Sequence, residues 1–178
     1  IYYQNRTLEL KHFIDAIQWK DYFKPKIVLE IGCGLGPRIL ALNHIGVNTF
    51  GIEKNEWAVK NSYIPEKIKQ GDIVNSHDLM WGELNILPDL VIAFDVLEHI
   101  DYDKIDDAIE NINDFLIDGK YLLVSIPIIG DPNLELDSTH KIKETKEWWL
   151  NKLREHGFKI KETPTWFNFH QQIIIAEK

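Results

Sequence analysis

The chain reads IVLEIGCGLGP from Ile27 to Pro37, and this stretch decides the fold. Branched aliphatic residues on both sides of Glu30 are typical of a short parallel strand that is buried on both faces. Three glycines at alternate positions follow, and they predict a tight turn in which the backbone approaches a ligand closely. Pro37 fits the first turn of a helix, where its missing N–H group costs nothing. A strand, a glycine turn and a helix start in this order indicate a nucleotide-type pocket at the carboxyl end of the strand.

The spacing of the glycines narrows the class of ligand. A dinucleotide fingerprint, G-x-G-x-x-G, requires glycine at position 37, where this chain has Pro37, and this argues against a nicotinamide oxidoreductase. The observed pattern is E-x-G-x-G-x-G, and it resembles motif I of the class I S-adenosylmethionine-dependent methyltransferases. The resemblance implies that S-adenosylmethionine is the cofactor and S-adenosylhomocysteine the product. It also implies cofactor contacts from Glu30, Gly32, Cys33, Gly34 and Gly36.

Two acids further along the chain extend this resemblance. Residues 48–53 predict a second strand that ends at Glu53, 21 residues past Gly32. This is close to the interval of about 20 residues expected for an acid that accepts hydrogen bonds from ribose hydroxyls. A carboxylate suits this task because it accepts two hydrogen bonds at once. Residues 67–73 resemble the third strand of the family. The resemblance implies cofactor contacts from Glu53 and its neighbour Lys54, from Asp72 at the adenine amine, and from the backbone of Ile73.

A second motif follows a predicted central strand over residues 89–94. The sequence DVLEHI, from Asp95 to Ile100, resembles a run that many small-molecule and nucleic-acid methyltransferases carry after their fourth strand. The resemblance implies that Asp95 lines the methionine side of the cofactor and that the run faces the methyl acceptor. A base helps only when the acceptor loses a proton as it attacks, and histidine titrates near neutral pH. The candidate catalytic residues are therefore His99 and His140.

Two alternatives to a small-molecule methyltransferase stay open. Asp95, Glu98, His99 and His140 resemble the metal-binding set of the small-RNA 2′-O-methyltransferases, and on a helix start the first three would share one face. Asp95 replaces a glutamate of that set, and metal-free methyltransferases also carry the Glu-His pair, so the chain is expected to use no metal. The other alternative is a non-catalytic partner protein that binds S-adenosylmethionine. Broken motifs would favour it, and the motifs here are intact.

The rest of the chain predicts helices that alternate with strands. The expected helices cover residues 6–20, 37–45, 55–63, 105–116 and 145–157, and the first buries Leu10, Phe13, Ile14 and Ile17. Further strands are expected near residues 121–127, 158–161 and 171–176. This alternation predicts a doubly wound, Rossmann-like α/β sheet. The resemblance covers residues 20–178 and implies seven mostly parallel strands in the order 3-2-1-4-5-7-6. We expect one domain over residues 1–178, with residues 1–24 as a leading helical segment.

Composition limits the partners. The chain has 178 residues, a formal net charge of −8 and a single cysteine. The negative charge argues against a general affinity for nucleic acid and leaves a small-molecule acceptor as the expectation. One cysteine predicts a reducing, cytoplasmic location, and no apolar run predicts a membrane span. The oligomeric state and the acceptor atom stay open. The acceptor is expected between residues 95–99, the 127–140 loop and the aromatic loop from Trp166 to His170.

Overall fold

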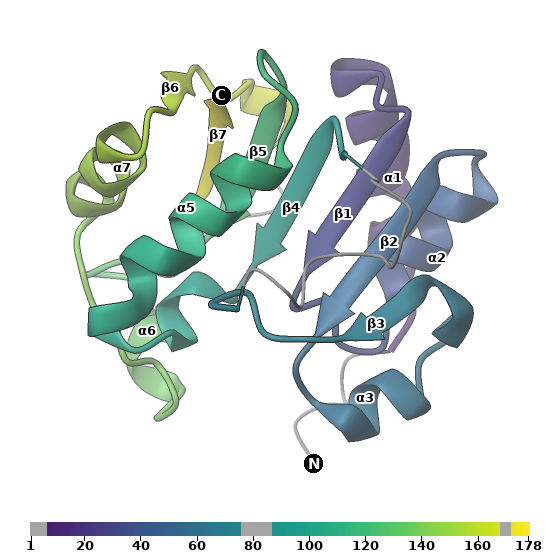
Figure 1. Ribbon diagram of the computed structural model, residues 1–178, viewed down its shortest axis with the longest axis horizontal. Coiled ribbons are helices and arrows are strands. Elements are labelled where there is room, and N and C mark those ends of the chain that lie inside the picture. Colours follow the sequence, from purple (N-terminus) through teal and green to yellow (C-terminus); the bar gives the residue numbers. More distant parts are fainter. Residues whose placement is uncertain (1–6, 76–86, 168–171) are drawn as a thin grey trace.

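A computed structural model of the chain describes residues 7–75, 87–167 and 172–178 (Figure 1). The described residues form one seven-stranded sheet in the order β3-β2-β1-β4-β5-β7-β6. Every pairing is parallel except the two that β7 makes with β5 and β6. The predicted strand order and the mostly parallel sheet are confirmed. The strands are β1 (Ile27–Ile31), β2 (Asn48–Glu53), β3 (Ile68–Gln70), β4 (Leu90–Phe94), β5 (Tyr121–Ser125), β6 (Lys159–Lys161) and β7 (Ile173–Glu177).

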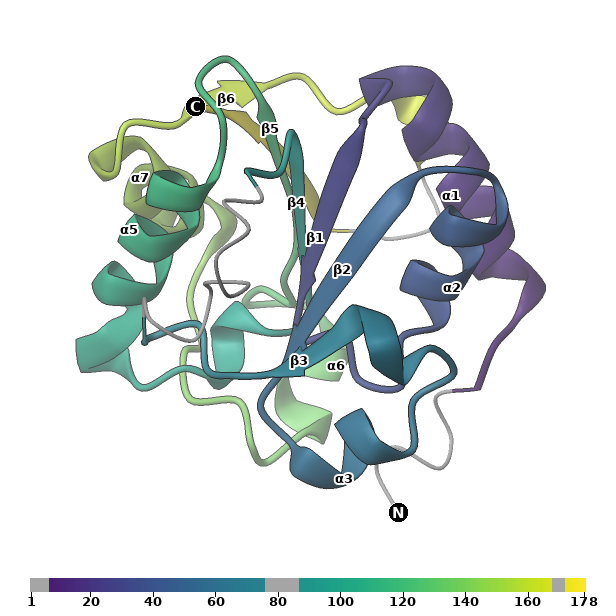
Figure 2. The ribbon, with the colours of Figure 1, turned by 45° about the vertical axis from the view of Figure 1, so that its right-hand side comes forward.

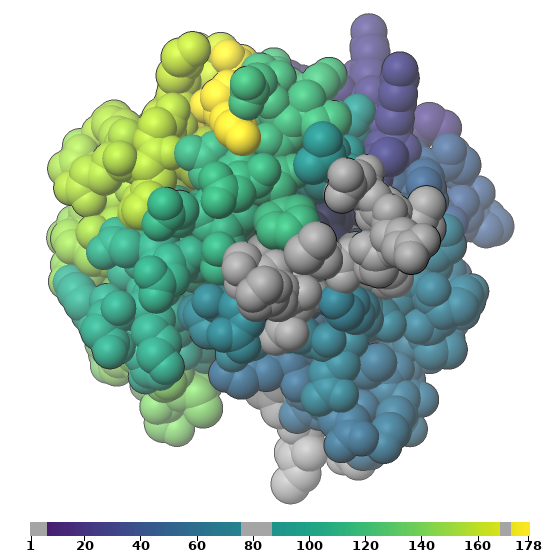
Figure 3. All heavy atoms as spheres, in the orientation of Figure 1, coloured from purple at the N-terminus to yellow at the C-terminus, as the bar shows by residue number. Residues whose placement is uncertain are grey.

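Helices cover both faces of the sheet, as in a doubly wound fold. Figure 2 shows α1 and α2 on one side of the strands and α5 and α7 on the other. In the space-filling view of the same side, green side chains of the α5 region lie at the centre and yellow-green side chains of the α7 region at the left (Figure 3). The helices are α1 (Leu10–Phe23), α2 (Pro37–His44), α3 (Glu56–Lys60), α5 (Ile105–Phe115), α6 (Pro132–Leu136) and α7 (Lys146–Glu155).

The alternation of side chains along β1 divides the hydrophobic core into two layers. Val28 packs with Ala16 and Trp19 under α1, whereas Leu29 and Ile31 belong to the layer under α5 and α7. The Trp19 side chain is 1% exposed, and its ring meets that of Phe94 edge-on at 5.4 Å. These layers fix the central strands, and therefore their carboxyl ends, relative to the helices.

The buried face of α1 differs from the prediction. Leu10 and Ile17, expected to be buried, are 75% and 51% exposed. The buried face instead carries His12, Asp15, Ala16, Trp19 and Phe23, which also lie at helical spacing. The physical reason is size, because burying Trp19 and Phe23 removes more apolar area from water than burying Leu10 and Ile17 would. Tyr2 and Tyr3, also noted as aromatics near this helix, lie outside the described residues.

Two further differences concern short segments. The stretch 128–140, predicted as a loop, contains α6, which begins at Pro132 and whose N-cap Asp131 accepts a hydrogen bond from the Asn133 amide. Residues 97–99 form a 3₁₀ turn rather than the start of an α-helix. Among the helices that the structure describes, none is long and apolar enough to cross a bilayer.

Candidate functional site

A cavity of about 730 Å³ lies at the carboxyl ends of β1, β2 and β4. This volume falls in the range of roughly 300–1,000 Å³ that is usual for small-molecule sites. Its walls come from the turn after β1, the end of β2, the segment after β3, the run after β4 and the start of α1. The cavity therefore lies where parallel α/β sheets bind ligands.

The turn after β1 requires glycine for two separate reasons. Gly32, Gly34 and Gly36 have positive φ angles of 64°, 57° and 75°, which L side chains rarely adopt. A Cβ atom on Gly32 would collide with the Val96 side chain, and one on Gly36 would lie 2.6 Å from Cδ1 of Ile68. The turn is thus shaped by backbone conformation and by lack of space, and it brings main chain directly to the cavity wall.

The cysteine inside this turn is a packing residue. Cys33 is 4% exposed and forms a small buried cluster with Ile39 and Ile68. Burial raises the pKa of its thiol well above the usual value, and the nearby carboxylates of Glu30 and Glu53 add to the effect. The side chain therefore stays a neutral thiol at neutral pH, which is unsuited to nucleophilic chemistry.

Glu30 lies behind the turn rather than on the cavity wall. It is 1% exposed, and its Oε1 accepts a hydrogen bond from Nη1 of Arg38 at 3.0 Å. The Arg38 guanidinium also lies 4.8 Å from the centre of the Phe94 ring, and Arg38 lines the cavity. The sequence analysis missed Arg38. Its position in the first turn of a helix could have indicated a partner, because the helix dipole disfavours a cation there unless an acid compensates for the charge.

Glu53 joins the glycine turn to the end of β2. Its Oε2 accepts from the backbone N–H of Gly34 at 2.8 Å, and its Oε1 accepts from that of Asn55 at 2.8 Å. The side chain is 5% exposed and lines the cavity. The backbone therefore orients this carboxylate, and carboxylate oxygens are suitable acceptors for the hydroxyl groups of a ligand.

The predicted adenine side is built by residues after β2 and β3. The Lys54 ammonium lies 2.6 Å from Oδ2 of Asp72, and Oδ1 of Asp72 accepts from the Val74 amide at 3.2 Å. Asp72 and the buried Ile73 line the cavity together with Lys54. The lysine ammonium is largely exposed, so it orients the Asp72 carboxylate at the rim and does not fill the cavity.

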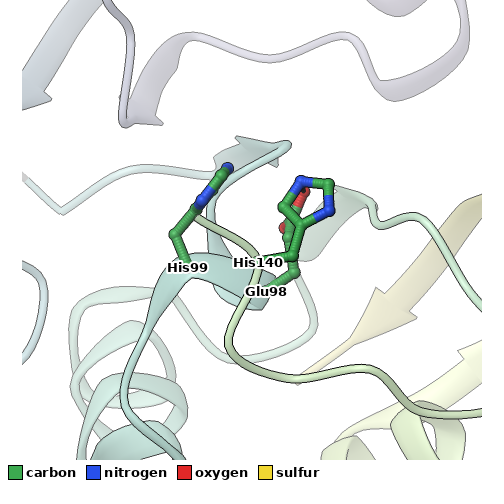
Figure 4. Close-up of side chains that lie close together, drawn as sticks. All are labelled: Glu98, His99 and His140. Atoms are coloured by element: carbon green, nitrogen blue, oxygen red, sulfur yellow. Dashed lines mark ion pairs between the residues drawn. The ribbon is translucent and has the colours of Figure 1, made fainter. Parts of the chain in front are cut away.

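The run after β4 separates Asp95 from the residues that follow it. Asp95 has a φ angle of 55°, turns the chain directly after β4 and lines the cavity. Glu98 is 0% exposed, and it lies beside His99 and His140 rather than beside Asp95 (Figure 4). The prediction that Asp95, Glu98 and His99 share one helical face is wrong, because the 3₁₀ turn over residues 97–99 has a different periodicity.

Hydrogen bonds fix the proton position on both imidazoles. Nδ1 of His140 lies 2.9 Å from the backbone oxygen of Leu134, which can only accept, so Nδ1 is the protonated nitrogen. Nδ1 of His99 lies 3.3 Å from the Thr139 backbone oxygen and 3.0 Å from its hydroxyl, whose hydrogen is donated to Asp137. His99 therefore also carries its proton on Nδ1. Burial lowers the pKa of His99.

The cavity collects most of the residues that the sequence analysis singled out. The lining includes the predicted Gly32, Cys33, Gly34, Glu53, Lys54, Asp72, Ile73, Asp95 and His99. Glu30, Gly36 and His140 are not part of the lining and lie behind it. The lining also includes residues that the prediction did not name, among them His12, Arg38, Thr139 and Lys141. Position alone does not assign these residues a role.

The aromatic loop does not belong to this site in its described part. The Trp166 ring packs 5.7 Å from Tyr22, and the Phe167 ring packs 5.9 Å from Phe23, at the end of α1. Phe23 in turn contacts Tyr121, the first residue of β5, so these rings lie near the amino ends of the parallel strands. The expected place of Trp166 beside the acceptor is wrong. Residues 168–170 of this loop lie outside the described residues.

Comparison with known proteins agrees with this architecture. The model of the methyltransferase domain family matches residues 2–165 of the chain. A SAM-dependent methyltransferase from Archaeoglobus fulgidus is similar in structure, with a TM-score of 0.75, 19% identity and coverage of 99% of this chain and 98% of the other.

Two further solved structures resemble the chain. One is an S-adenosylmethionine-dependent methyltransferase from Clostridium acetobutylicum, with a TM-score of 0.74, 13% identity and coverage of 98% and 94%. The other is human N-acetylserotonin methyltransferase in complex with SAM, with a TM-score of 0.67, 19% identity and coverage of 94% of this chain but 51% of the other. A sequence comparison with curated proteins finds no significant match. The chain therefore belongs to the methyltransferase domain family, and its Rossmann-like fold is the one that S-adenosylmethionine-dependent methyltransferases have.

Proposed function

We propose that the protein transfers the methyl group of S-adenosylmethionine to a small molecule held beside residues 95–99. The observation that carries the proposal is the position of the Glu53 carboxylate. Two backbone amides hold it at the wall of a cavity that the glycine turn also lines. When bound, S-adenosylmethionine supplies a methyl group that is already activated on a sulfonium. The protein's own residues then have to hold the two reactants in line, which contributes several kcal/mol to the lowering of the barrier.

The cavity residues fit this cofactor in three places. We assign the ribose hydroxyls to Glu53, because its oriented oxygens are the acceptors that two neighbouring hydroxyls need. We assign the adenine edge to Asp72 and the Ile73 amide, at the rim that Lys54 helps to order. We assign the middle of the cofactor to Gly32 and Gly34, because these glycines line the cavity with main chain alone and let a ligand approach closely.

The acceptor side is assigned to His99 and His140. His99 lines the cavity and is held at Nδ1 by Thr139, so its Nε2 lone pair is left to accept a hydrogen bond from an acceptor hydroxyl or amine. His140 packs against His99 with ring centres 4.7 Å apart and positions it from behind. His99 is thus the proposed catalytic residue in contact with substrate, and His140 is the residue that positions it.

Charge and redox state favour a small molecule in a reducing compartment. The cavity wall mixes acids with bases, including Asp101 and Lys141, whose side chains pair at 2.6 Å. The described part of this wall therefore offers no basic track for a phosphate backbone, in keeping with the net charge of −8. The single cysteine is a free, buried thiol, which suits the cytoplasm.

The experiment uses S-adenosylmethionine with an isotope-labelled methyl group. The purified protein is incubated with it and with either a small-molecule metabolite extract or total RNA. We expect labelled product from the metabolite extract and not from RNA. We also expect His99→Ala to lose turnover while it still binds S-adenosylmethionine. Label that enters RNA alone, or full turnover by His99→Ala, would contradict the proposed acceptor or its placement.

A further inference from the structure

Glu98, His99 and His140 converge at the acceptor wall of the cavity (Figure 4). One carboxylate oxygen and one nitrogen of each imidazole lie within 4.8 Å of one another. Glu98 is fully buried, and the His140 side chain is 6% exposed. We propose that these three side chains bind a divalent transition-metal ion such as Zn²⁺, whereas the metal alternative in the sequence analysis also included Asp95 and the expectation was a metal-free enzyme.

The first support comes from the partners behind the imidazoles. Histidines that bind a metal almost always donate their other ring N–H to a carbonyl or a carboxylate, which fixes the ring and its tautomer. His140 donates Nδ1–H to the Leu134 carbonyl, and His99 donates Nδ1–H to Thr139, whose hydroxyl is in turn anchored on Asp137. Both rings are thus held so that Nε2, the usual ligand atom, keeps its lone pair.

The second support is electrostatic. Nε2 of His140 lies 3.8 Å from Oε1 of Glu98 and 4.0 Å from Oδ2 of Asp137. A lone pair that faces carboxylate oxygens is unfavourable unless positive charge lies among them. A cation among the three groups would be attracted by both carboxylates and would use a lone pair of each imidazole.

The distances allow such an ion once the three side chains move closer together. Ligands about 2.0–2.1 Å from a tetrahedral Zn²⁺ lie about 3.3 Å from one another. The His140–Glu98 separation of 3.8 Å needs to shorten by about 0.5 Å, and the widest separation among the three ligand atoms, which is within 4.8 Å, by up to about 1.5 Å. Rotation of the side chains would have to supply this movement. Asp95, which the comparison with RNA enzymes would have made a ligand, is not among the converging groups.

The donor set selects the kind of ion. Two imidazole nitrogens and one carboxylate are typical of zinc and other transition metals, whereas Mg²⁺ prefers oxygen ligands. Three protein ligands leave a fourth position open, and His99 brings that position to the cavity. A role for the ion in catalysis rests on the proposed function. With the ion at Nε2 of His99, the direct hydrogen bond proposed above would be replaced, and the ion itself would hold acceptors that carry an oxygen or nitrogen donor beside the methylated atom.

The test measures metal binding directly and does not depend on turnover. The wild-type protein is stripped with a chelator and titrated with Co²⁺, Zn²⁺ and Mg²⁺, by calorimetry and, for Co²⁺, by visible absorption. We expect one equivalent of Zn²⁺ or Co²⁺ to bind, and Mg²⁺ to bind at least tenfold more weakly. Absence of stoichiometric Zn²⁺ and Co²⁺ binding to the wild-type protein would overturn the proposal.

Variants locate the ion. His140→Ala and Glu98→Gln should each lose at least about tenfold in Co²⁺ affinity, and Thr139→Ala, which removes a supporting hydroxyl, about tenfold. The matched control is His44→Ala, which removes an exposed imidazole at the end of α2 and should bind like the wild type. Thr139 is exposed, so its variant decides the matter if substitution of the buried Glu98 prevents folding. Wild-type affinity in folded His140→Ala or in Thr139→Ala would refute the site.

S-adenosylmethionine binding is measured on the same samples to separate the two proposals. A protein that binds S-adenosylmethionine but no Co²⁺ would refute the metal site and leave the proposed methyl transfer standing. A protein that binds Co²⁺ at this site but no S-adenosylmethionine would refute the proposed function alone.

Discussion

Replacing Glu53 by alanine removes a side chain that links the glycine turn to the end of β2. Its two oxygens accept from the Gly34 and Asn55 amides at 2.8 Å each and, in the proposed complex, from the two ribose hydroxyls. A hydrogen bond to a charged group contributes about 1.5–3 kcal/mol. We therefore expect Glu53→Ala to weaken S-adenosylmethionine binding by about 1.5–3 kcal/mol, which is roughly ten- to 150-fold in Kd.

Titration calorimetry with S-adenosylhomocysteine measures this loss, and two comparisons separate a ribose contact from damage to the turn. Glu53→Gln keeps one acceptor oxygen and should lose less affinity than Glu53→Ala. An analogue that lacks both ribose hydroxyls should bind the wild type and Glu53→Ala with similar affinity. If the substitution weakens this analogue as much as the natural ligand, or if Kd changes less than about twofold in a variant with a native melting curve, the assigned role is wrong.

Three further predictions concern the core and the glycine turn. Trp19→Ala should lower the free energy of unfolding by about 3–5 kcal/mol, because the Trp19 side chain is only 1% exposed and its removal leaves a cavity. Trp57→Ala, at an exposed position, should lower it by about 0.5 kcal/mol, and denaturant titration measures both free energies. Gly32→Ala should cost about 1–3 kcal/mol more than Gly119→Ala, since both have positive φ but only the former meets a side chain, and equal losses would contradict the collision. Burial raises the pKa of the Cys33 thiol, so the native protein should resist iodoacetamide at pH 8 and react only when unfolded; mass spectrometry detects the adduct, and rapid native labelling would contradict the buried assignment.

Local chemistry explains why the sequence predicted much of the fold and the cofactor side of the cavity. The glycine turn, Glu53 and Asp72 each follow a strand, and parallel strands bring their carboxyl ends to one edge of the sheet whatever the details of packing. The strand order came from the family resemblance, because periodicity along the chain does not say which strands are neighbours.

The failures are places where tertiary contacts decided between equivalent local patterns. On α1, two faces have helical spacing, and only packing against Phe94 and its neighbours selects the one with Trp19. The described part of the aromatic loop after β6 lies near the amino ends of the parallel strands, because Trp166 packs on Tyr22. The positive φ of Asp95 breaks the helical register that would have placed it with Glu98.

The measurement that tests the central claim most directly is the affinity for S-adenosylmethionine of two matched glycine variants. Gly34 lines the cavity at a φ of 57°, and Gly119 has a φ of 70° with no atom within 4 Å of an added Cβ. Valine at either position costs similar backbone strain, but only the valine at 34 would occupy the place assigned to the cofactor. Calorimetry should show 1:1 binding to the wild type and to Gly119→Val and none to a folded Gly34→Val. Undiminished affinity in Gly34→Val, or no binding to the wild type, would contradict the account.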